Sequence, residues 1–373
     1  MCAIEAGKRG RSVLVIERSE KIGKKILISG GGRCNFTNRS VTFQNFISEN
    51  PHFCKSALSR FTPQDFITLV EKHGIPYHEK KLGQLFCDTS STEIIHLLEK
   101  ECQAAHVEII TSADVLKILK NNCFEIGTNQ GNFESQSLVI ATGGLSIPKM
   151  GATAFGYEMA KQFGLPIVEC NPALVPFTWS KKDAETFGSL AGISFPARVR
   201  FGNQSFYEDI LITHKGLSGP AILQISSYWQ HGAPVYVDLL PEKNILETFI
   251  KGRNSGLELS VVLAQYLPKR FIQKWWEQMV PEKFSGPCSD KELKEILDRI
   301  HSWPIIPSGT EGYDKAEVTS GGVHTTEFSS TTLESKKVKG LFFIGEVMDV
   351  TGHLGGYNFQ WAWSSGFAAG QFV

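Results

Sequence analysis

The chain has 373 residues, 42% of them hydrophobic, and its 38 basic residues balance its 38 acidic residues. This length predicts two or three domains, and the zero net charge argues against nucleic acid or an anionic membrane as a partner. No apolar run reaches the roughly 18 residues of a membrane span. The eight cysteines have no C-x-x-C spacing, which indicates reduced thiols without a metal site and predicts a cytoplasmic protein.

The first element is a short helix over residues 3–10, closed by a glycine, and a strand over residues 12–16 follows it. The strand is apolar, as expected for a buried parallel strand, and it ends in Glu17. In a dinucleotide-binding fold, an acidic residue at this place binds ribose hydroxyls about 20 residues after a glycine-rich turn. That turn and its strand would precede Met1, so the pattern predicts a truncated nucleotide fold. The alternative is a genuine helix start with an ordinary Glu17.

The next segment is Leu27–Asn38, which contains Ser29-Gly-Gly-Gly-Arg-Cys-Asn35. Three glycines allow a backbone to pass close to a ligand. Arg33 offers a planar fork for a pyrophosphate, and the amide of Asn35 suits a ring edge. The alternative is a surface loop with solvated side chains. We favour the ligand interpretation because the segment follows a strand that ends in a glutamate.

Helices are expected over residues 62–73, with Thr62 as N-cap, and over residues 91–104. Three short strands between residues 115 and 135 are expected to form an antiparallel meander. A buried strand then ends in Ala141-Thr-Gly-Gly144, whose glycines would let a cofactor pass without a clash; an ordinary strand exit is the alternative. A further helix is expected to begin at Lys149.

From about residue 172 to residue 229 the chain alternates as antiparallel strands do, and helical stretches follow at 271–279 and 290–297. We therefore expect a discontinuous nucleotide-binding domain over 1–170 and 318–373, incomplete at its N-terminus and interrupted by an insert over 171–317. The insert is expected to be β-rich over 171–240 and helical over 241–317. Within it, Ser218 is expected to cap a helix that begins at Pro220, rather than to act as a nucleophile.

The end of the chain carries the most specific pattern. A strand over residues 340–344 runs into the Gly-rich segment Gly345–Asn358 and then into a helix that ends near Ala369. A helix N-terminus after such a turn binds anions, while the carboxylate of Asp349 suits a hydroxyl of a polyol. A cofactor that contains a phosphate, a polyol and a flat ring fits such a groove. This combination indicates FAD. His353 is either a proton donor to the ring or a turn residue, and both interpretations stay open.

These motifs occur in one order along the chain, together with Thr213-His-Lys-Gly-Leu-Ser-Gly-Pro220 and Thr319-Ser-Gly-Gly-Val323. The sequence thereby resembles, nearly end to end, the BaiN/RdsA-type (aminoacetone-oxidase-like) FAD-dependent oxidoreductases. The resemblance implies an α/β fold with a Rossmann-type FAD-binding domain of the glutathione-reductase class. It also implies an inserted domain with a β-barrel-like part and a helical part.

By position in these motifs, the resemblance implies a set of cofactor-binding residues. They are Glu17, Arg18, Lys24, Gly32, Arg33, Cys34, Asn35, Val115, Ala141, Thr142, Gly143, Gly345, Glu346, Asp349, Gly355, Gly356, Tyr357 and Asn358. Glu17 is expected at the adenosine ribose and Val115 at the adenine. The segment from Gly345 to Asn358 is expected along the pyrophosphate, the ribityl chain and the flavin. No catalytic residue is identified.

The expected function is a FAD-dependent, NAD(P)-binding oxidoreductase that acts on an unidentified small molecule, with the flavin as hydride acceptor or donor. The sequence leaves NAD(P)H or the substrate itself as the reductant, and it leaves the oligomeric state undecided. One alternative is a truncated chain that binds no flavin. A second alternative is a flavoprotein acting on RNA, against which the neutral charge counts.

Overall fold

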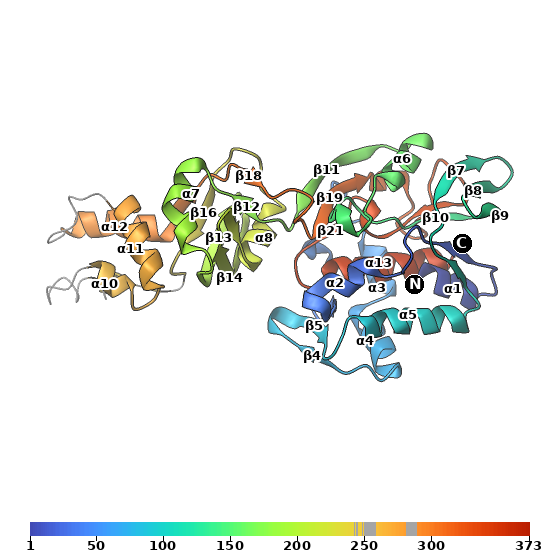
Figure 1. Cartoon of the computed structure of the whole chain (residues 1–373), viewed down its shortest axis with the longest axis horizontal. Helices are drawn as coiled ribbons and strands as arrows, with labels where there is room; N and C mark the ends of the chain where they lie inside the picture. Colours follow the sequence, from blue (N-terminus) through green and yellow to red (C-terminus); the bar gives the residue numbers. More distant parts are fainter. Residues whose placement is uncertain (242, 244, 248, 250–258, 281–288) are drawn as a thin grey trace. The chain divides into compact units, whose positions relative to one another are not determined.

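The computed structural model in Figure 1 describes all residues except 242, 244, 248, 250–258 and 281–288. The described chain divides into two compact units. Unit 1 comprises Met1–Asn171 and Val318–Val373, and unit 2 comprises Pro172–Glu317. Among the described residues, no helix combines the length and the apolar character that crossing a membrane requires.

Unit 1 contains two pairs of parallel strands. After helix α1 (Cys2–Lys8), strand β1 (Leu14–Ile16) pairs with β6 (Glu108–Ile110), and strand β10 (Leu138–Ile140) pairs with β20 (Leu341–Phe343). Strand β20, which follows unit 2 in sequence, therefore returns to unit 1 beside a strand that precedes unit 2. Parallel pairs joined by long crossovers are typical of the predicted α/β fold.

Strand β1 differs from its prediction in two respects. It begins at Leu14 rather than at Ser12, and its three residues are half-buried rather than fully buried. Within the described residues, β1 and β10 each have a strand partner on one side only. The expected strand before Met1 stays a prediction.

Helix α13 (Tyr357–Gly370) lies in the core of unit 1. Its Gln360, Ser364 and Ser365 are fully buried, and each is hydrogen-bonded, as buried polar groups require. Helix α1 packs against its C-terminal half, where a Cβ at Gly370 would lie 2.6 Å from the Cβ of Glu5. The small residues of α13 thus allow the two helices to approach closely.

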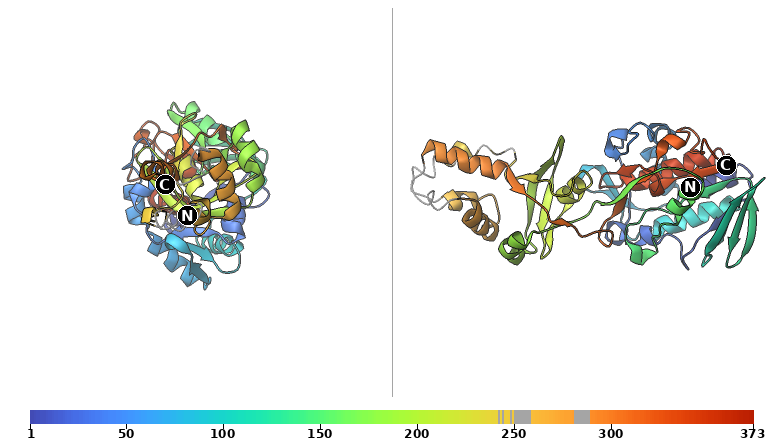
Figure 2. Two further views of the ribbon diagram at one scale, coloured as in Figure 1. Left: turned by 90° about the vertical axis from the view of Figure 1, so that its left-hand side faces the viewer. Right: turned by 90° about the horizontal axis from the view of Figure 1, so that it is seen from above.

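Five further helices and four small sheets complete unit 1. The helices are α2 (Lys24–Ile28), α3 (Lys55–Arg60), α4 (Pro63–Lys72), α5 (Thr92–Ala104) and α6 (Phe155–Gln162). The antiparallel sheet β2–β5–β4 uses Asn35–Asn38, Gln84–Cys87 and Tyr77–Glu79, and the antiparallel meander β7–β8–β9, in teal in Figure 2, uses Val115–Lys120, Phe124–Thr128 and Gly131–Ser135. The remaining pairs are β3 (Phe46–Ile47) with β21 (Thr351–Gly352) and β11 (Ile167–Ala173) with β19 (Val318–Val323).

Local sequence signals explain two helix starts. The hydroxyl of Thr62 accepts from the backbone N–H of Asp65 at 3.4 Å and so caps α4, as predicted. Helix α6 begins at Phe155, so the predicted start at Lys149 is wrong. Ile147 and Gly151 have φ values of 56° and 100°, and the left-handed region cannot continue a helix.

Unit 2 is built on one antiparallel sheet of seven strands. Its order is β17–β16–β13–β14–β15–β12–β18, and the strands are Trp303–Ile305, Val235–Asp238, Ser194–Phe201, Gln204–Ile212, Gly216–Ser218, Phe177–Thr178 and Gly309–Thr310. Residues on the inner face, such as Val199 and Ile210, are completely buried. Alternation along the strands is the pattern that the sequence predicts for this part.

Helices cover the inner face of this sheet and extend unit 2 beyond it. They are α7 (Lys181–Phe187), α8 (Pro220–Ser226), α10 (Leu259–Leu263), α11 (Lys269–Met279) and α12 (Asp290–His301). Helix α8 contacts β13 and β14, and the ring of Phe271 in α11 lies 4.6 Å from that of Phe195 in β13. The predicted helical part of the insert also includes residues outside the described ones.

The predicted cap of helix α8 is wrong. Ser218 ends strand β15, and Gly219 occupies the N-cap position. Gly219 has a φ of 90°, and a Cβ there would lie 2.7 Å from the carbonyl oxygen of Asp209. This turn therefore requires a glycine at position 219 because the backbone of Asp209 lies close to it, and it does not depend on a capping hydroxyl.

Candidate functional site

Three motifs that are far apart in the sequence meet at the carboxyl end of β10. A Cβ at Gly144 would lie 2.5 Å from the hydroxyl of Thr319 and 2.9 Å from Glu346 Oε1. A side chain at this position would overlap with both. The Ala141-Thr-Gly-Gly144 exit, strand β19 and the 3-10 turn η8 (Gly345–Val347) are therefore in direct contact because position 144 is a glycine.

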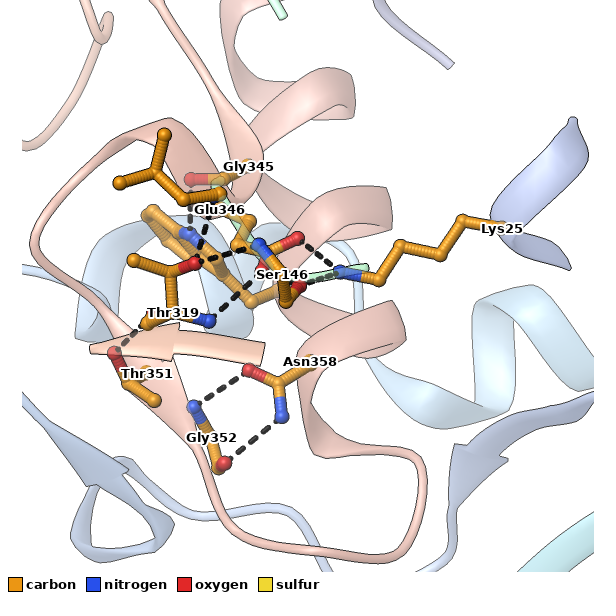
Figure 3. Close-up of polar contacts among 10 residues, drawn as sticks. Lys25, Ser146, Thr319, Gly345, Glu346, Thr351, Gly352 and Asn358 are labelled. Atoms are coloured by element: carbon orange, nitrogen blue, oxygen red, sulfur yellow. Dashed lines mark hydrogen bonds and ion pairs between the residues drawn. The ribbon is translucent and has the colours of Figure 1, made fainter. Parts of the chain in front are cut away.

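The carboxylate of Glu346 holds these segments together (Figure 3). Its Oε2 accepts from Lys25 Nζ at 2.7 Å, and its Oε1 accepts from the backbone N–H of Thr319 at 3.0 Å and from the hydroxyl of Ser146 at 3.3 Å. Lys25 also donates to the hydroxyl of Ser146 at 2.8 Å. An ion pair at this distance, with Glu346 only 17% exposed, is a charge-assisted bond that fixes α2 to the turn.

The turn that leads into α13 is fixed at both of its ends. The backbone N–H of Gly345 donates to the hydroxyl of Ser365 at 3.0 Å, and the indole of Trp361 donates to the carbonyl of Gly345 at 3.0 Å. The amide of Asn358 makes two bonds of 2.8 Å to the backbone of Gly352 (Figure 3). The site is thus preorganised by groups of α13 itself.

The predicted Gly-Gly-Gly-Arg-Cys-Asn segment also reaches the start of α13. With the amide of Asn35 turned so that both of its polar atoms have partners, its oxygen accepts from the N–H of Gly356 at 3.1 Å and its nitrogen donates to the carbonyl of Leu85. A Cβ at Gly356 would lie 2.4 Å from the backbone of Thr37. The amide of Asn35, expected at a ring edge, is therefore engaged with the protein's own backbone.

A second group of predicted residues lies at the end of β1. The guanidinium of Arg18 lies 3.0 Å from the carboxylate of Asp114, and the backbone N–H of Ala113 donates to the carbonyl of Glu17. Val115 follows directly in β7. These are the residues expected at the adenosine end of the cofactor, and the carboxylate of Glu17 itself accepts from the N–H of Ser19 at 2.6 Å.

A cavity of about 370 Å³ adjoins this second group. Residues 20–22, which follow Glu17 closely, line one side, and Ile109 and Thr111 line another. Its lining includes neither Glu346 nor the turn before α13, so we place the candidate site by the convergence of the motifs rather than by this cavity.

Two predicted side chains are buried within the protein. Asp349 is 3% exposed, and its carboxylate accepts from the N–H of Glu49 at 2.8 Å and from the hydroxyl of Ser48 at 3.2 Å. Burial raises its pKa above the ordinary value of 3.8 despite these bonds. Burial also raises the pKa of Cys34 to about 12, so this thiol packs as a core side chain and not as a redox group.

His353 lies in the turn before α13. Its backbone N–H donates to the carbonyl of Asn45 at 2.9 Å, and its ring lies 6.1 Å from that of Tyr357. Burial lowers the pKa of His353 to about 4. The imidazole is therefore uncharged at neutral pH and can donate a hydrogen bond without carrying a positive charge.

The residues present fit FAD at this place. Gly143 and Gly345 have φ values of 73° and 70°, and a Cβ at Gly345 would meet no atom within 4 Å. Open backbone of this kind lets a large ligand approach closely, and the N-terminus of a 14-residue helix attracts a pyrophosphate. Gly143, Gly345 and the first turn of α13 would hold the phosphates and the flavin, and Glu346 would hold a ribityl hydroxyl.

Sequence reasoning missed three residues of the network. Lys25 bonds Glu346, and Ser146 and Thr319 complete the contacts, while the role of the adjacent Lys24 at the cofactor stays a prediction. Thr319 stands in a motif that the sequence already marks. For Lys25 the signal is weaker, because two adjacent lysines leave the helix face undecided until its partner is known.

Comparison with known proteins identifies the family of this chain. The sequence matches the family described as "HI0933-like protein Rossmann domain" over residues 1–372. An Escherichia coli (strain K12) protein named "Ribosomal RNA dihydrouridine synthase" is 49% identical over 376 residues, which cover 99% of this chain and 94% of the relative. The Haemophilus influenzae (strain ATCC 51907 / DSM 11121 / KW20 / Rd) protein of the same name is 47% identical, over 98% of this chain and 94% of the relative.

A third relative carries a different name. The "3-dehydro-bile acid delta(4,6)-reductase" of Clostridium scindens (strain ATCC 35704 / DSM 5676 / VPI 13733 / 19) is 31% identical over 382 residues, which cover 96% of this chain and 92% of the relative. The chain therefore belongs to the HI0933-like family and is a flavin-dependent oxidoreductase with a Rossmann-type FAD-binding domain.

Proposed function

We propose that this chain reduces uridine in ribosomal RNA to dihydrouridine, with FAD as the bound cofactor and NAD(P)H as the electron donor. The observation that carries the proposal is the 49% identity, over 99% of this chain, to the Escherichia coli protein of that name. The proposal implies a cytoplasmic location, since ribosomal RNA is found there in a bacterium.

The named activities of the relatives share one kind of chemistry. Uridine has a carbon–carbon double bond conjugated with a carbonyl, and a 3-dehydro-delta(4,6) bile acid has a dienone. In both, two electrons and a proton enter at the carbon far from the carbonyl, and a second proton enters at the carbon next to it. The charge that develops between these steps is negative and rests on the carbonyl oxygen.

Bound FAD supplies the hydride in this chemistry. The N-terminus of α13 (Tyr357–Gly370) would favour negative charge at the flavin by roughly 0.3–1 kcal/mol, and by up to about 2 kcal/mol where the site is partly buried. Glu346, fixed by Lys25 and Thr319, would orient the ribityl chain. His353, neutral because burial lowers its pKa to about 4, is suited to polarise a carbonyl oxygen by hydrogen bonding.

This proposal departs from the expectation drawn from charge. A net charge of zero argues against extensive phosphate contacts, but an enzyme that modifies one nucleotide needs only a local basic surface. The zero net charge bears on the strength of nonspecific binding and not on the presence of one RNA contact.

The second candidate is reduction of a small conjugated ketone. The 31% identity to the Clostridium scindens reductase, over 96% of this chain, favours it. Both candidates use the same flavin chemistry, and they differ in whether the substrate is a polymer. The comparison of the two substrates in one assay separates them.

The experiment uses the purified protein with FAD, NADPH and a protein-free ribosomal RNA. The expected result is a gain of two hydrogen atoms on uridine, measured by mass spectrometry of the digested RNA, with no gain when FAD is omitted. A steroid dienone is offered in parallel. If the FAD-loaded protein reduces the dienone and leaves all uridines unchanged, the second candidate replaces the first.

A further inference from the structure

The hairpin formed by β4 (Tyr77–Glu79) and β5 (Gln84–Cys87) carries an exposed turn of unusual conformation. Leu82 in this turn has a φ of 56° and is 63% exposed. An exposed leucine in the left-handed region gains no burial and costs about 1–2 kcal/mol. Such strain persists where the surroundings hold it, and it occurs often at ligand contacts.

The surroundings do hold this turn, and they connect it to the candidate site. The amide nitrogen of Asn38 donates to the carbonyl of Leu82 at 3.0 Å and to the carbonyl of Gly355 at 3.0 Å. The backbone N–H of Arg39 donates to the carbonyl of Gly83 at 2.9 Å. One buried amide thus joins the tip of the hairpin to the turn that precedes α13.

The hairpin presents a flat ring beside two cations. The imidazole of His78 lies nearly parallel to the ring of Phe86, at 6.1 Å between centroids and 15° between planes. Its side chain is 43% exposed, and its Nδ1 lies 2.6 Å from a carboxylate oxygen of Asp88. The ammonium of Lys80 lies 5.4 Å from the centroid of Phe86. Lys80 and Lys81 are both exposed, while the nearby Glu79 carboxylate is bonded to Arg39 at 2.5 Å.

Building on the proposed function, we infer that this hairpin binds the nucleotides that flank the target uridine in RNA. The exposed face of His78, supported from behind by Phe86, would stack on one base, and Lys80 and Lys81 would contact phosphates on either side of it. Single-stranded RNA is bound in this way, by aromatic or imidazole faces with adjacent basic side chains.

The hydrogen bonds of Asn38 connect the proposed RNA contact to Gly355, close to the candidate site. A base held on His78 would be tied through Asn38 to the backbone that receives the flavin, so the neighbouring nucleotide would be presented to the site in one register. A small ketone has no second base and no phosphate, so it would gain nothing from this surface.

The test compares the double variant K80E/K81E with wild type and with the matched control K181E/K182E in α7 of unit 2. Both variants change two adjacent exposed lysines. Binding of a uridine-containing, single-stranded fragment of ribosomal RNA is measured by fluorescence anisotropy over a range of salt. We expect K80E/K81E to weaken binding at least tenfold, and to lower the salt dependence by about 0.7 for each phosphate contact that is lost.

A second variant tests whether the change in RNA affinity comes from net charge alone. His78→Ala removes the stacking face and leaves both lysines, and we expect it to weaken binding without changing the salt dependence. Retained FAD and unchanged thermal unfolding show that each variant is folded. Equal RNA affinity of K80E/K81E and K181E/K182E would overturn the inference. It would also be overturned if K80E/K81E lost affinity for the ribosomal subunit but kept its affinity for protein-free RNA.

The outcomes separate this inference from the proposed function. If wild type reduces uridine in RNA and K80E/K81E binds RNA normally, the function stands and the hairpin is not the RNA contact. If K80E/K81E loses RNA binding while wild type reduces no uridine, the RNA contact stands and the proposed reaction is wrong. If wild type binds no RNA, both are wrong.

Discussion

Strands β13 and β14 of unit 2 are joined by a turn at Gly202, whereas β10 and β20 of unit 1 are separated in sequence by the whole of unit 2. In unit 2, the long hairpin of β13 and β14 and its neighbour β15 follow one another directly in sequence, and local alternation of apolar residues specifies their pairing. In unit 1, the candidate site exists only when segments from residue 25 to residue 358 have come together.

The difference shows where function is most sensitive to single changes. Contacts that join distant segments depend on a few glycines and one carboxylate, as at Gly144, Gly356 and Glu346. Contacts within a local hairpin are repeated at each residue pair, so one substitution removes a small share of them. Four pairs of substitutions test this contrast between distant and local contacts.

The largest effect is expected at Gly356. Gly356→Ala places a Cβ 2.4 Å from the backbone of Thr37, at a φ of 94°. We expect a loss of about 2–5 kcal/mol in the stability of unit 1, from the left-handed conformation and the overlap together. Calorimetry measures it, with proteolysis to show that unit 2 stays folded.

Gly31→Ala is the matched control for this change. Gly31 has a φ of 67°, and a Cβ there would meet no atom within 4 Å, so only the conformational cost of about 1–2 kcal/mol applies. Equal losses in both variants would mean that close contact between distant segments does not limit the stability of unit 1.

The next effect concerns the ion pair of the network. Glu346→Gln removes the charge that Lys25 meets at 2.7 Å, and we expect FAD binding to weaken by about 1–3 kcal/mol. Titration followed by flavin fluorescence measures the affinity. Lys215→Met, which removes the partner of Glu311 at 3.5 Å in unit 2, serves as the control and should leave it unchanged. Unaltered FAD affinity in a folded E346Q protein would exclude Glu346 from the cofactor site.

The third effect is pH-dependent and again belongs to unit 1. Glu101 on α5 accepts hydrogen bonds from Lys72 and His73 at 2.8 and 2.9 Å and pairs with Lys8 at 3.2 Å. Burial alone would raise its pKa, but these partners lower it to about 2. Because this pKa lies below the ordinary 4.5, the ionised Glu101 stabilises the folded state fully above pH 4.5. This contribution is lost as the pH falls toward 2.

Glu101→Gln should therefore destabilise unit 1 by about 1–3 kcal/mol at pH 7. The difference from wild type should shrink as the pH falls from 4.5 toward 2, as thermal unfolding at several pH values measures. Glu99→Gln on the exposed face of the same helix is the control. A difference that stays constant over this range would show that the charge of Glu101 is not what joins α5 to α1 and α4.

Much of the fold could be predicted from sequence, because the signals involve residues that are close together in the chain. The cap at Thr62 and the meander from Val115 to Ser135 involve residues within one element or one hairpin. The return of β20 to unit 1 was also predictable, because the strand over 340–344 needs a parallel partner. The glycine-rich segment before the last helix and the carboxylate of Asp349 indicated FAD, and the family resemblance implied the same cofactor.

Details of the site could not be read from the sequence, because they depend on partners that only the fold brings near. The choice of Lys25 over Lys24 depends on which face of α2 meets Glu346. The carboxylate of Asp349, expected at a ribityl hydroxyl, bonds the backbone of Glu49, and no local signal connects these residues. Whether Asp349 also reaches the cofactor stays a prediction.

The smallest effect tests the local rules of unit 2 with two serines that look alike in sequence. Ser180 precedes α7 and accepts from the N–H of Asp183 at 3.1 Å, so it is a true cap. Ser218 precedes α8 but lies in β15, one residue before the N-cap Gly219. Ser180→Ala should cost about 1 kcal/mol, while Ser218→Ala should stay within about 0.5 kcal/mol of wild type. Chemical denaturation of both variants measures the two values. A loss at Ser218 equal to that at Ser180 would mean that its hydroxyl stabilises the start of α8 after all, and that the backbone space around Gly219 is not what selects this turn.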